Sequence, residues 1–401
     1  MKILHVTNQV TLGGGVAKAV LSLVNEQAND RRLSVALATS RAREDITDPK
    51  HRALFNQDVK LLGYTKRVSM SLFFARWTEA ILRKALFRRG GWTSSGLVGS
   101  NLAAFINSYD VDIVHLHWVQ DGMFSWVDLS NIEKKVVWTL HDYWPCNAPE
   151  HTLMRKVTVW RWYRRLRTKS LCKMGAHFIA PTEHVKDRFV SLLGWTEEHT
   201  ASNIRVIPNI YNRKEVLASE GKASNRRYGK VITIGFGAKA YRDDKNKGYI
   251  HFCRLARVLS PREKCCFVLF GDSRAEVDSG SEAQVRYYGM VERREDLDSI
   301  LQEIDIFCVL SESETFGYTT LEAVDNGCLV AVRETCGLAE AVERYNVGCV
   351  LYGEDYAEWA KAMMKAVECK EDANKTMFLR YFEGKRVVDM HVRLYEDCLG
   401  L

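Results

Sequence analysis

The feature that most constrains the fold is a nearly unbroken apolar run at residues 304–310, which leads through a polar loop into a helical pattern. Such a run is typical of a strand buried on both faces, as in a parallel sheet. After Gly317, apolar residues recur at helical spacing, at Leu321 and Val324. Strand, loop and helix start together form the β–α unit of an open α/β sheet, where ligands bind at the carboxyl ends of the strands.

This unit carries two candidate binding residues. Glu314 lies in the loop, and Glu322 lies one to two turns into the helix. Carboxylates in this position can hold a polyhydroxyl ligand, and the backbone N–H groups after Gly317 can hold a phosphate. Two ordinary solvated glutamates are the alternative interpretation. The Phe316-Gly317 pair between them, in a strand–loop–helix setting, favours a binding site.

The same pattern occurs along the whole chain in two series. A second series of strands restarts at residue 230, after a first series at residues 2–6, 33–38, 112–118, 136–144, 178–182 and 204–209. A chain of 401 residues is too long for one typical domain. We therefore expect an α/β fold with two doubly wound, Rossmann-like domains. Their predicted bounds are 1–209 and 228–401, with a polar linker at 210–227 and a last helix that packs back on the first domain.

The charge is unevenly distributed between the two halves. Residues 1–210 carry 29 Lys/Arg against 18 Asp/Glu, and the remainder carries 28 against 32. Two segments, 66–89 and 154–173, interleave basic with aromatic residues. Such segments can lie on an anionic membrane surface, although an apolar face packed on the domain would give segment 66–89 the same composition. No nucleic-acid motif accompanies these segments, so we expect no nucleic-acid partner.

The cysteines and the hydropathy pattern bear on the compartment. The eleven cysteines form no C-x-x-C pair, and several lie inside apolar runs, as expected for thiols in a reducing compartment. The N-terminal apolar run is too short for a signal peptide, and no run of 18 apolar residues occurs. We expect a cytoplasmic protein, peripheral on the inner face of the cytoplasmic membrane.

A glycine loop, Gly13-Gly14-Gly15, separates the first predicted strand from a helix. This setting suits phosphate binding at a helix N-terminus. A dinucleotide fingerprint would require a third glycine where Lys18 stands and an acidic residue at the end of the second strand, where the sequence reads Thr-Ser-Arg. A nicotinamide cofactor is therefore disfavoured.

Three histidines lie at predicted strand ends. His115 and His117 alternate onto one face of their strand, and His141 precedes Asp142. No carboxylate or cysteine at ligand spacing supports a metal site, so we expect none and interpret the first two as a buried or site-lining polar pair. The aspartate and the aromatic residues beside His141 favour a role in a ligand site.

These residues resemble a known family. The pattern Glu314-x-Phe316-Gly317-x-x-x-x-Glu322 resembles the E-x-F-G-x-x-x-x-E signature of retaining glycosyltransferases of the GT-B fold, in glycosyltransferase family four. Gly14-Gly15 and Lys247-Gly248 are similar to the family's N-terminal glycine loop and to the start of its nucleotide domain. The segment 138–144 resembles one found in exopolysaccharide and capsule members, such as those that build colanic acid.

The resemblance implies two domains that face each other across a cleft and a division of labour in the second domain. Glu322 would bind the ribose, and Glu314 the donor sugar. The backbone at Phe316, Gly317 and Tyr318 would hold sugar and diphosphate, and Lys247 would neutralise the departing diphosphate.

In the first domain, the resemblance implies that His141 contacts the donor sugar and that backbone at Gly14 and Gly15 contacts the diphosphate. The family's diphosphate arginine has no clear counterpart here, and Arg242, Lys239 and Lys245 are the candidates.

The expected function is that of a retaining, metal-independent glycosyltransferase without a cofactor. It would move a sugar from a UDP- or GDP-sugar to a glycan or lipid-linked acceptor in the synthesis of exopolysaccharide, capsule or lipopolysaccharide. The alternative is a catalytically silent protein on the same fold that only binds a sugar nucleotide.

Overall fold

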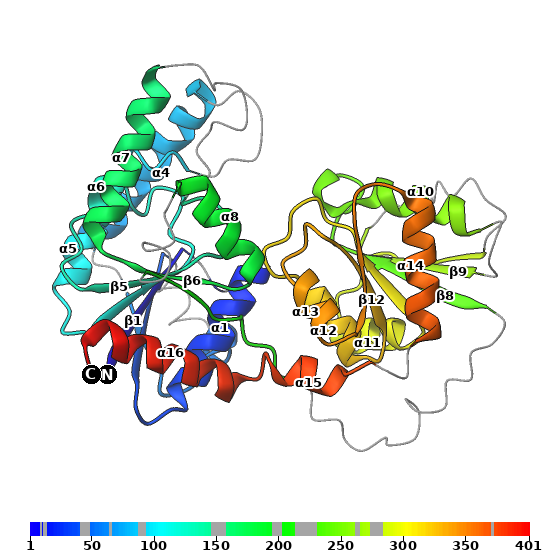
Figure 1. The fold of residues 1–401 in the computed structure, drawn as a ribbon. Coiled ribbons are helices and arrows are strands. Elements are labelled where there is room, and N and C mark those ends of the chain that lie inside the picture. Colours follow the sequence, from blue (N-terminus) through cyan, green and yellow to red (C-terminus); the bar gives the residue numbers. More distant parts are fainter. Residues whose placement is uncertain are drawn as a thin grey trace. The chain divides into compact units, whose positions relative to one another are not determined.

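The computed structural model describes residues 1–8, 10, 14–40, 49–63, 66–86, 94–145, 158–194, 203–212, 231–260, 265–272, 284–369 and 373–401, without the side chains of 83–86 and 158–164. The chain divides into two compact units (Figure 1), Met1–Ile210 with Gly384–Leu401, and Tyr211–Glu383. The C-terminal helix therefore belongs to the first unit. The predicted linker, 210–227, lies outside the described residues apart from 210–212.

The first unit is built on a seven-stranded sheet in the order β3-β2-β1-β4-β5-β6-β7. All of its pairings are parallel. The strand order reverses between β1 and β4, which makes this pair the topological switch point, where ligands bind in open α/β sheets. The strands are β1 (Lys2–Thr7), β2 (Ser34–Thr39), β3 (Lys60–Leu62), β4 (Ile113–Leu116), β5 (Lys135–Thr139), β6 (His177–Ala180) and β7 (Ile204–Val206).

Helices cover both faces of this sheet, and each face has its own apolar core. Alternation along β1 sends Ile3 to a core shared with α1 and α16, and Leu4 to a core shared with α4 to α8. The helices are α1 (Gly15–Ala28), α3 (Pro49–Arg52), α4 (Lys66–Leu86), α5 (Leu102–Asn107), α6 (Trp126–Leu129), α7 (Thr158–Met174), α8 (Glu183–Leu193) and α16 (Gly384–Leu399).

The second unit repeats this plan with a six-stranded parallel sheet in the order β10-β9-β8-β11-β12-β13. Its switch point lies between β8 and β11. The strands are β8 (Ile232–Gly237), β9 (Cys265–Phe270), β10 (Gln284–Tyr287), β11 (Ile306–Val309), β12 (Leu329–Arg333) and β13 (Gly348–Leu351). The helical elements are the 3-10 turn η2 (Lys245–Lys247), α10 (Tyr249–Leu259), α11 (Arg294–Gln302), α12 (Tyr318–Asp325), α13 (Ala339–Arg344), α14 (Tyr356–Glu368) and α15 (Lys375–Arg380).

The apolar runs of the sequence explain these sheets. Strands β9, β11 and β12 are buried at every position, as expected for parallel strands covered on both faces. The predicted fold class, α/β with two Rossmann-like parallel sheets, is confirmed. The strand β11, the loop and α12 form the β–α unit from which the prediction started.

Candidate active site

The second unit holds a cavity of about 410 Å³ at the carboxyl ends of its strands. A volume of this size is typical of a small-molecule site. The cavity lies at the switch point, since Gly237 ends β8 and Phe307 belongs to β11. Its walls combine apolar and charged side chains. The lining residues are Gly237, Ala238, Lys239, Phe270, Gly271, Met290, Val291, Glu292, Leu297, Leu301, Phe307, Thr319 and Glu322.

The loop between β11 and α12 is held by the neighbouring strand connection. Glu314 forms an isolated parallel bridge with Cys336, and the N–H of Gly337 donates to the carbonyl of Glu314 at 2.8 Å. Gly317 caps α12 with a φ of 91°, a conformation that a residue with a Cβ rarely adopts. The loop therefore ends in a sharp turn at the N-terminus of α12.

The structure brings Lys247 and Glu314 together. Lys247 Nζ lies 3.6 Å from Glu314 Oε2, and both side chains are about three-quarters buried. Backbone contacts fix this arrangement, since the N–H of Glu312 donates to the carbonyl of Asn246 at 2.8 Å. Gly248 permits the close approach because a Cβ there would lie 1.9 Å from the carbonyl oxygen of Leu310. A cation and a carboxylate, 67 positions apart in the sequence, thus meet beside one strand end.

Glu322 lines the cavity and is bound by an arginine that the sequence analysis did not single out. Arg294 Nη1 donates to Glu322 Oε1 at 2.6 Å, and Arg294 Nε lies 3.3 Å from Asp298 Oδ1. Glu322 is 12% exposed, so the ion pair is largely shielded from water. Arg294 thus fixes the direction of the Glu322 carboxylate at the cavity wall.

The side chains of Phe316 and Tyr318 belong to the core and not to the cavity wall. Phe316 is buried and packs edge-on against Tyr318 and Phe382. Burial raises the pKa of the Tyr318 hydroxyl above its ordinary range. Only the backbone of this stretch is therefore placed to meet a ligand.

Arg242 lies in the turn after β8. Its guanidinium stacks over the ring of Tyr249 at 5.5 Å, and its backbone N–H donates to Asp272. Among the described residues, its Nε and Nη2 make no hydrogen bond. Lys239, another candidate for the diphosphate cation, lines the cavity itself. Lys245, the third candidate, lies in η2.

In the first unit, Gly14 and Gly15 occupy the N-terminus of α1. Gly14 is the N-cap and, as a glycine, has no side chain with which to cap the helix. Both glycines are exposed. The predicted Gly13 lies outside the described residues.

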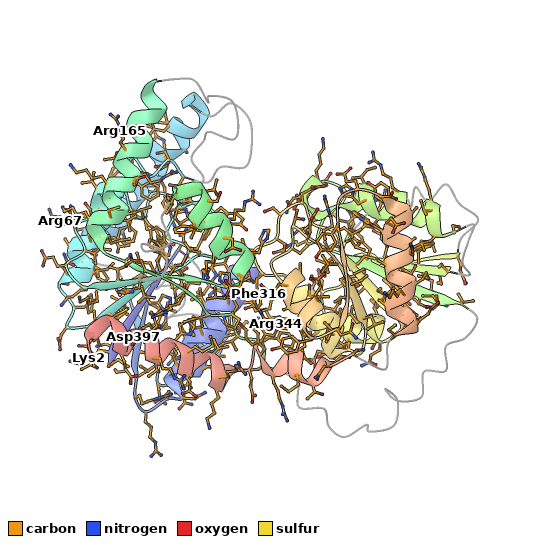
Figure 2. The ribbon with its side chains drawn as sticks, viewed as in Figure 1. Lys2, Arg67, Arg165, Phe316, Arg344 and Asp397 are labelled. Atoms are coloured by element: carbon orange, nitrogen blue, oxygen red, sulfur yellow. The ribbon has the colours of Figure 1, made fainter. Side chains whose placement is uncertain are left out.

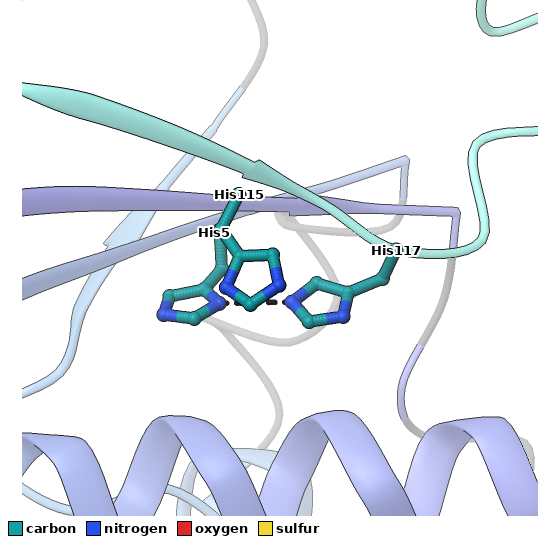
Figure 3. Close-up of side chains that lie close together, drawn as sticks. All are labelled: His5, His115 and His117. Carbon is teal, nitrogen blue, oxygen red and sulfur yellow. Dashed lines mark hydrogen bonds between the residues drawn. The ribbon is translucent and has the colours of Figure 1, made fainter. Parts of the chain in front are cut away.

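A cluster of buried histidines crosses the switch point of the first sheet (Figure 3). His5 on β1 pairs in register with His115 on β4, and His117 follows on the same face. Their ligand atoms all lie within 4.8 Å of one another. His117 extends the cluster to His141, with 3.1 Å between Nδ1 and Nε2.

His141 lies at the carboxyl end of β5, beside the half-buried carboxylate of Asp142. The Asp142 carboxylate accepts hydrogen bonds from Trp118 Nε1, from Gln120 and from the N–H of Trp144. Burial raises the pKa of this carboxyl, and the hydrogen bonds oppose the shift. Burial lowers the pKa of His141 to about 3, so the imidazole is neutral at physiological pH.

Helix α4 carries an aromatic stripe that faces outward. The helix buries Val68, Leu72 and Ala75 in the first unit. At helical spacing on another face, five large apolar side chains are 46–68% exposed: Met70, Phe73, Phe74, Trp77 and Ile81. Arg67 on α4 and Arg165 on α7 are also exposed (Figure 2). The apolar residues of this segment therefore form both a packed face and an exposed one, which the sequence alone could not distinguish.

Comparison with known proteins identifies the class. A family model described as Glycosyltransferase Family 4 matches residues 13–215, and one described as Glycosyl transferases group 1 matches residues 238–377. The chain therefore belongs to the glycosyltransferases that these models describe. This confirms the enzyme class that the signature around Glu314 predicted.

The chain is also similar to individual proteins and solved structures. An uncharacterized 41.2 kDa protein in the cps region of Klebsiella pneumoniae is 23% identical over 338 residues, which cover 79% of this chain and 87% of that protein. Anabaena Alr3699/HepE in complex with UDP has a TM-score of 0.63 at 15% identity, over 99% of this chain and 100% of that one. Sucrose-phosphate synthase from Thermosynechococcus elongatus has a TM-score of 0.63 at 14% identity, over 100% of this chain and 99% of that one. These structures share the GT-B fold, as predicted.

The part of the chain that the structure describes contains no helix long and apolar enough to cross a membrane.

Gly248→Ala tests the approach that places Lys247. The methyl group would meet the Leu310 carbonyl and require an unfavourable φ, so we expect the second unit to lose more than about 2 kcal/mol of stability. Gly327→Ala is the matched control, because Gly327 has a φ of 91° but no described residue lies within 4 Å of where the new Cβ would stand, and it should cost only about 1–2 kcal/mol. Urea unfolding measures both. Equal losses in the two variants would contradict the close contact.

The buried histidines predict a loss of stability in acid. Burial lowers the pKa of His5 and His141 to about 3 and that of His391 to about 4. The histidines of the unfolded chain have pKa values near 6.5. Between about pH 4 and pH 6.5, the unfolded chain therefore binds more protons than the folded one. Stability is full above about pH 6.5 and falls below it, by up to about 1.4 kcal/mol per pH unit for each histidine.

Urea unfolding, followed by the fluorescence of the buried Trp126 and Trp138, measures this slope. His391→Gln should make the slope between pH 4.5 and 6 shallower by about one proton. A slope that His391→Gln leaves unchanged would show that this histidine is not buried in the neutral form.

Proposed function

We propose that this glycosyltransferase moves a sugar from a nucleotide-diphosphate sugar to a glycan or lipid-linked acceptor in the synthesis of a cell-surface polysaccharide, with retention of configuration. The observation that carries the proposal is the 410 Å³ cavity, with Glu322 in its wall. The Lys247–Glu314 pair lies at the same carboxyl edge of the sheet, with Glu314 on the loop that leads into α12 and Lys247 in η2.

The cavity suits a nucleoside. Phe270, Met290 and Leu297 offer apolar surface for a base, and Glu322 offers a carboxylate for ribose hydroxyls. The ion pair with Arg294 orients this carboxylate before a ligand binds, which lowers the cost of ordering it. We propose uridine as the base, because Alr3699/HepE is described in complexes with UDP and with UDP-glucose.

The diphosphate would be held by cations and by backbone N–H groups. Lys247, the Arg242 guanidinium and the N-terminus of α12 are the positive groups that we assign to it. Glu314 would exchange its contact with Lys247 for hydroxyls of the donor sugar. His141 and the N–H of Gly15 are the proposed contributions of the first unit.

For this reaction the protein must supply positive charge at the departing diphosphate and hold the acceptor hydroxyl in position. The diphosphate leaves from an oxocarbenium-like carbon, and Lys247 and Arg242 stabilise the negative charge that develops on it. The acceptor hydroxyl attacks from the face that the diphosphate leaves and gives its proton to the departing diphosphate oxygen, which retains the configuration without an enzyme nucleophile. Because protein cations supply the positive charge, we propose that the reaction needs no metal ion.

We infer the type of polysaccharide from the Klebsiella pneumoniae relative. Its description places that protein in the cps region, and we propose a capsule- or exopolysaccharide-type product for this chain. The exposed stripe on α4 supports an acceptor at a membrane. Aromatic side chains beside exposed arginines are typical of surfaces that insert into the headgroup region of anionic bilayers.

Substitutions at the two glutamates separate binding from chemistry. Glu322→Ala should weaken UDP binding roughly tenfold to 100-fold, since it removes charge-assisted hydrogen bonds. Glu314→Ala should retain UDP binding and lower the release of UDP from the donor at least 100-fold. Calorimetry with UDP and GDP, and UDP release from a panel of UDP-sugars, measure these effects.

The control is Glu368→Ala, an exposed glutamate at the end of α14 that should change neither quantity. Wild-type protein that binds neither UDP nor GDP would overturn the donor assignment. Binding without turnover of any donor would favour the silent sugar-nucleotide-binding alternative.

The membrane proposal predicts a loss of binding when the α4 stripe becomes polar. Phe73→Ser with Trp77→Ser should lower co-sedimentation with phosphatidylglycerol vesicles at least tenfold, because each buried aromatic contributes about 1.5–3 kcal/mol. Binding of the wild type should also weaken as salt rises. Val127→Ser is the control, since Val127 is 51% exposed on α6, outside the stripe. Equal sedimentation of the double variant and the control would exclude the stripe as the docking surface.

A further inference from the structure

A continuous hydrogen-bonded chain connects the helices behind the first sheet to His141. Gln27 on α1 bonds Tyr395 on α16 at 3.1 Å and His5 Nε2 at 2.8 Å. His5 Nδ1 lies 2.9 Å from His117 Nε2, and His117 Nδ1 lies 3.1 Å from His141 Nε2. We propose that this chain is a positioning device, which holds His141 in the tautomer with its proton on Nε2 and presents Nδ1 as the accepting nitrogen. Its role in catalysis rests on the function proposed for His141.

The direction of the chain follows from the Gln27 amide. Its Nε2 donates to the Tyr395 hydroxyl, so its oxygen faces His5. A carbonyl oxygen only accepts, and His5 must therefore carry its proton on Nε2. His5 Nδ1 then accepts from His117 Nε2, and His117 Nδ1 accepts from His141 Nε2.

A side branch agrees with this direction. Tyr395 accepts from Gln27 and donates its own proton to His115 Nδ1 at 2.7 Å. His115 therefore carries its proton on Nε2, which donates to Thr139 Oγ1 at 2.7 Å. All four histidines share one tautomer, because reversing any single bond would require reversing every other.

The chain holds protons in place and does not conduct them. An amide oxygen is too weak a base to take the proton of His5, so a proton that enters at His141 has no group to receive it at the far end. Gln27, His5 and Tyr395 are fully buried, and water does not reach that end. Burial also keeps His5 and His117 neutral.

Metal binding is the competing explanation for His5, His115 and His117, and the ring geometry disfavours it. The rings of His5 and His117 are within 14° of parallel, with centroids 5.2 Å apart and their nearest nitrogens 2.9 Å apart. Two such rings face each other in line, as in an N–H···N bond. A tetrahedral zinc ion, at about 2.1 Å from each nitrogen, would need about 3.4 Å between them and rings turned toward a common point. Both nitrogens of His115 already bond to hydroxyl groups.

Imidazole nitrogen NMR tests the tautomers directly. In protein with ¹⁵N-labelled histidine, His5, His117 and His141 should each show a protonated Nε2 and a bare Nδ1, with couplings across the two N–H···N bonds. The signals should not change between pH 6 and 8 or on addition of a chelator. A proton on Nδ1 of His141, or bound zinc that the chelator removes, would overturn the proposal.

Variants at Gln27 test the positioning role. Gln27→Met keeps the volume and removes the acceptor, so the tautomer of His141 should become mixed and kcat should fall at least tenfold, with little change in the donor KM. Gln27→Glu should restore both, because its carboxyl oxygen again accepts from His5. Gln57→Met, at an exposed glutamine, is the control.

The two readouts separate this inference from the proposed function. The NMR result decides the tautomer even if the protein transfers no sugar. A mixed tautomer in Gln27→Met with unchanged kcat would overturn the positioning role and leave glycosyl transfer intact. Should Gln27→Met fail to fold, Tyr395→Phe removes the bonds to Gln27 and His115 with a smaller change in shape, and the same outcomes apply.

Discussion

Both units depend on one constraint, which is that their central parallel strands are buried on both faces. A polar group inside such a sheet costs several kcal/mol unless it finds a partner. Polar side chains are therefore concentrated where the strands end and the chain meets water. This explains why Glu314, Lys247 and Glu322 all lie at one edge of the second sheet, beside a cavity at the switch point.

At that edge, each proposed ligand-binding carboxylate is neutralised by a cation of the protein. Lys247 lies beside Glu314, and Arg294 bonds Glu322. These pairs hold the side chains in position while the site is empty. The sequence could single out Glu314 and Glu322 as candidates, because strand-end position and spacing are local properties, whereas Lys247 was a candidate only through the family resemblance. It could not predict Arg294, because nothing local connects that arginine to a helix 28 residues further on.

The histidine chain is an exception, because its polar side chains are buried inside the first unit and not at a strand end facing water. The sequence predicted part of this cluster but not the residues that bond to it. Alternation along β4 predicted that His115 and His117 share a face, which the structure confirms. The residues that satisfy this cluster, Gln27 and Tyr395, come from opposite ends of the chain, and only the packing of α1 beside α16 brings them there. The exposed stripe on α4 could not be predicted for a similar reason. Periodicity shows which apolar residues share a helix face, but not which face packs against the domain.

We propose that the carboxyl edge of the second sheet binds a nucleotide-diphosphate sugar. Hydrogen–deuterium exchange with and without a UDP-sugar tests it most directly, because it locates the ligand without assuming a product. We expect slower exchange at residues 237–248, 289–292 and 314–326, the segments that line the cavity or carry its cations. Protection confined to other segments, at ligand concentrations that saturate binding, would contradict it.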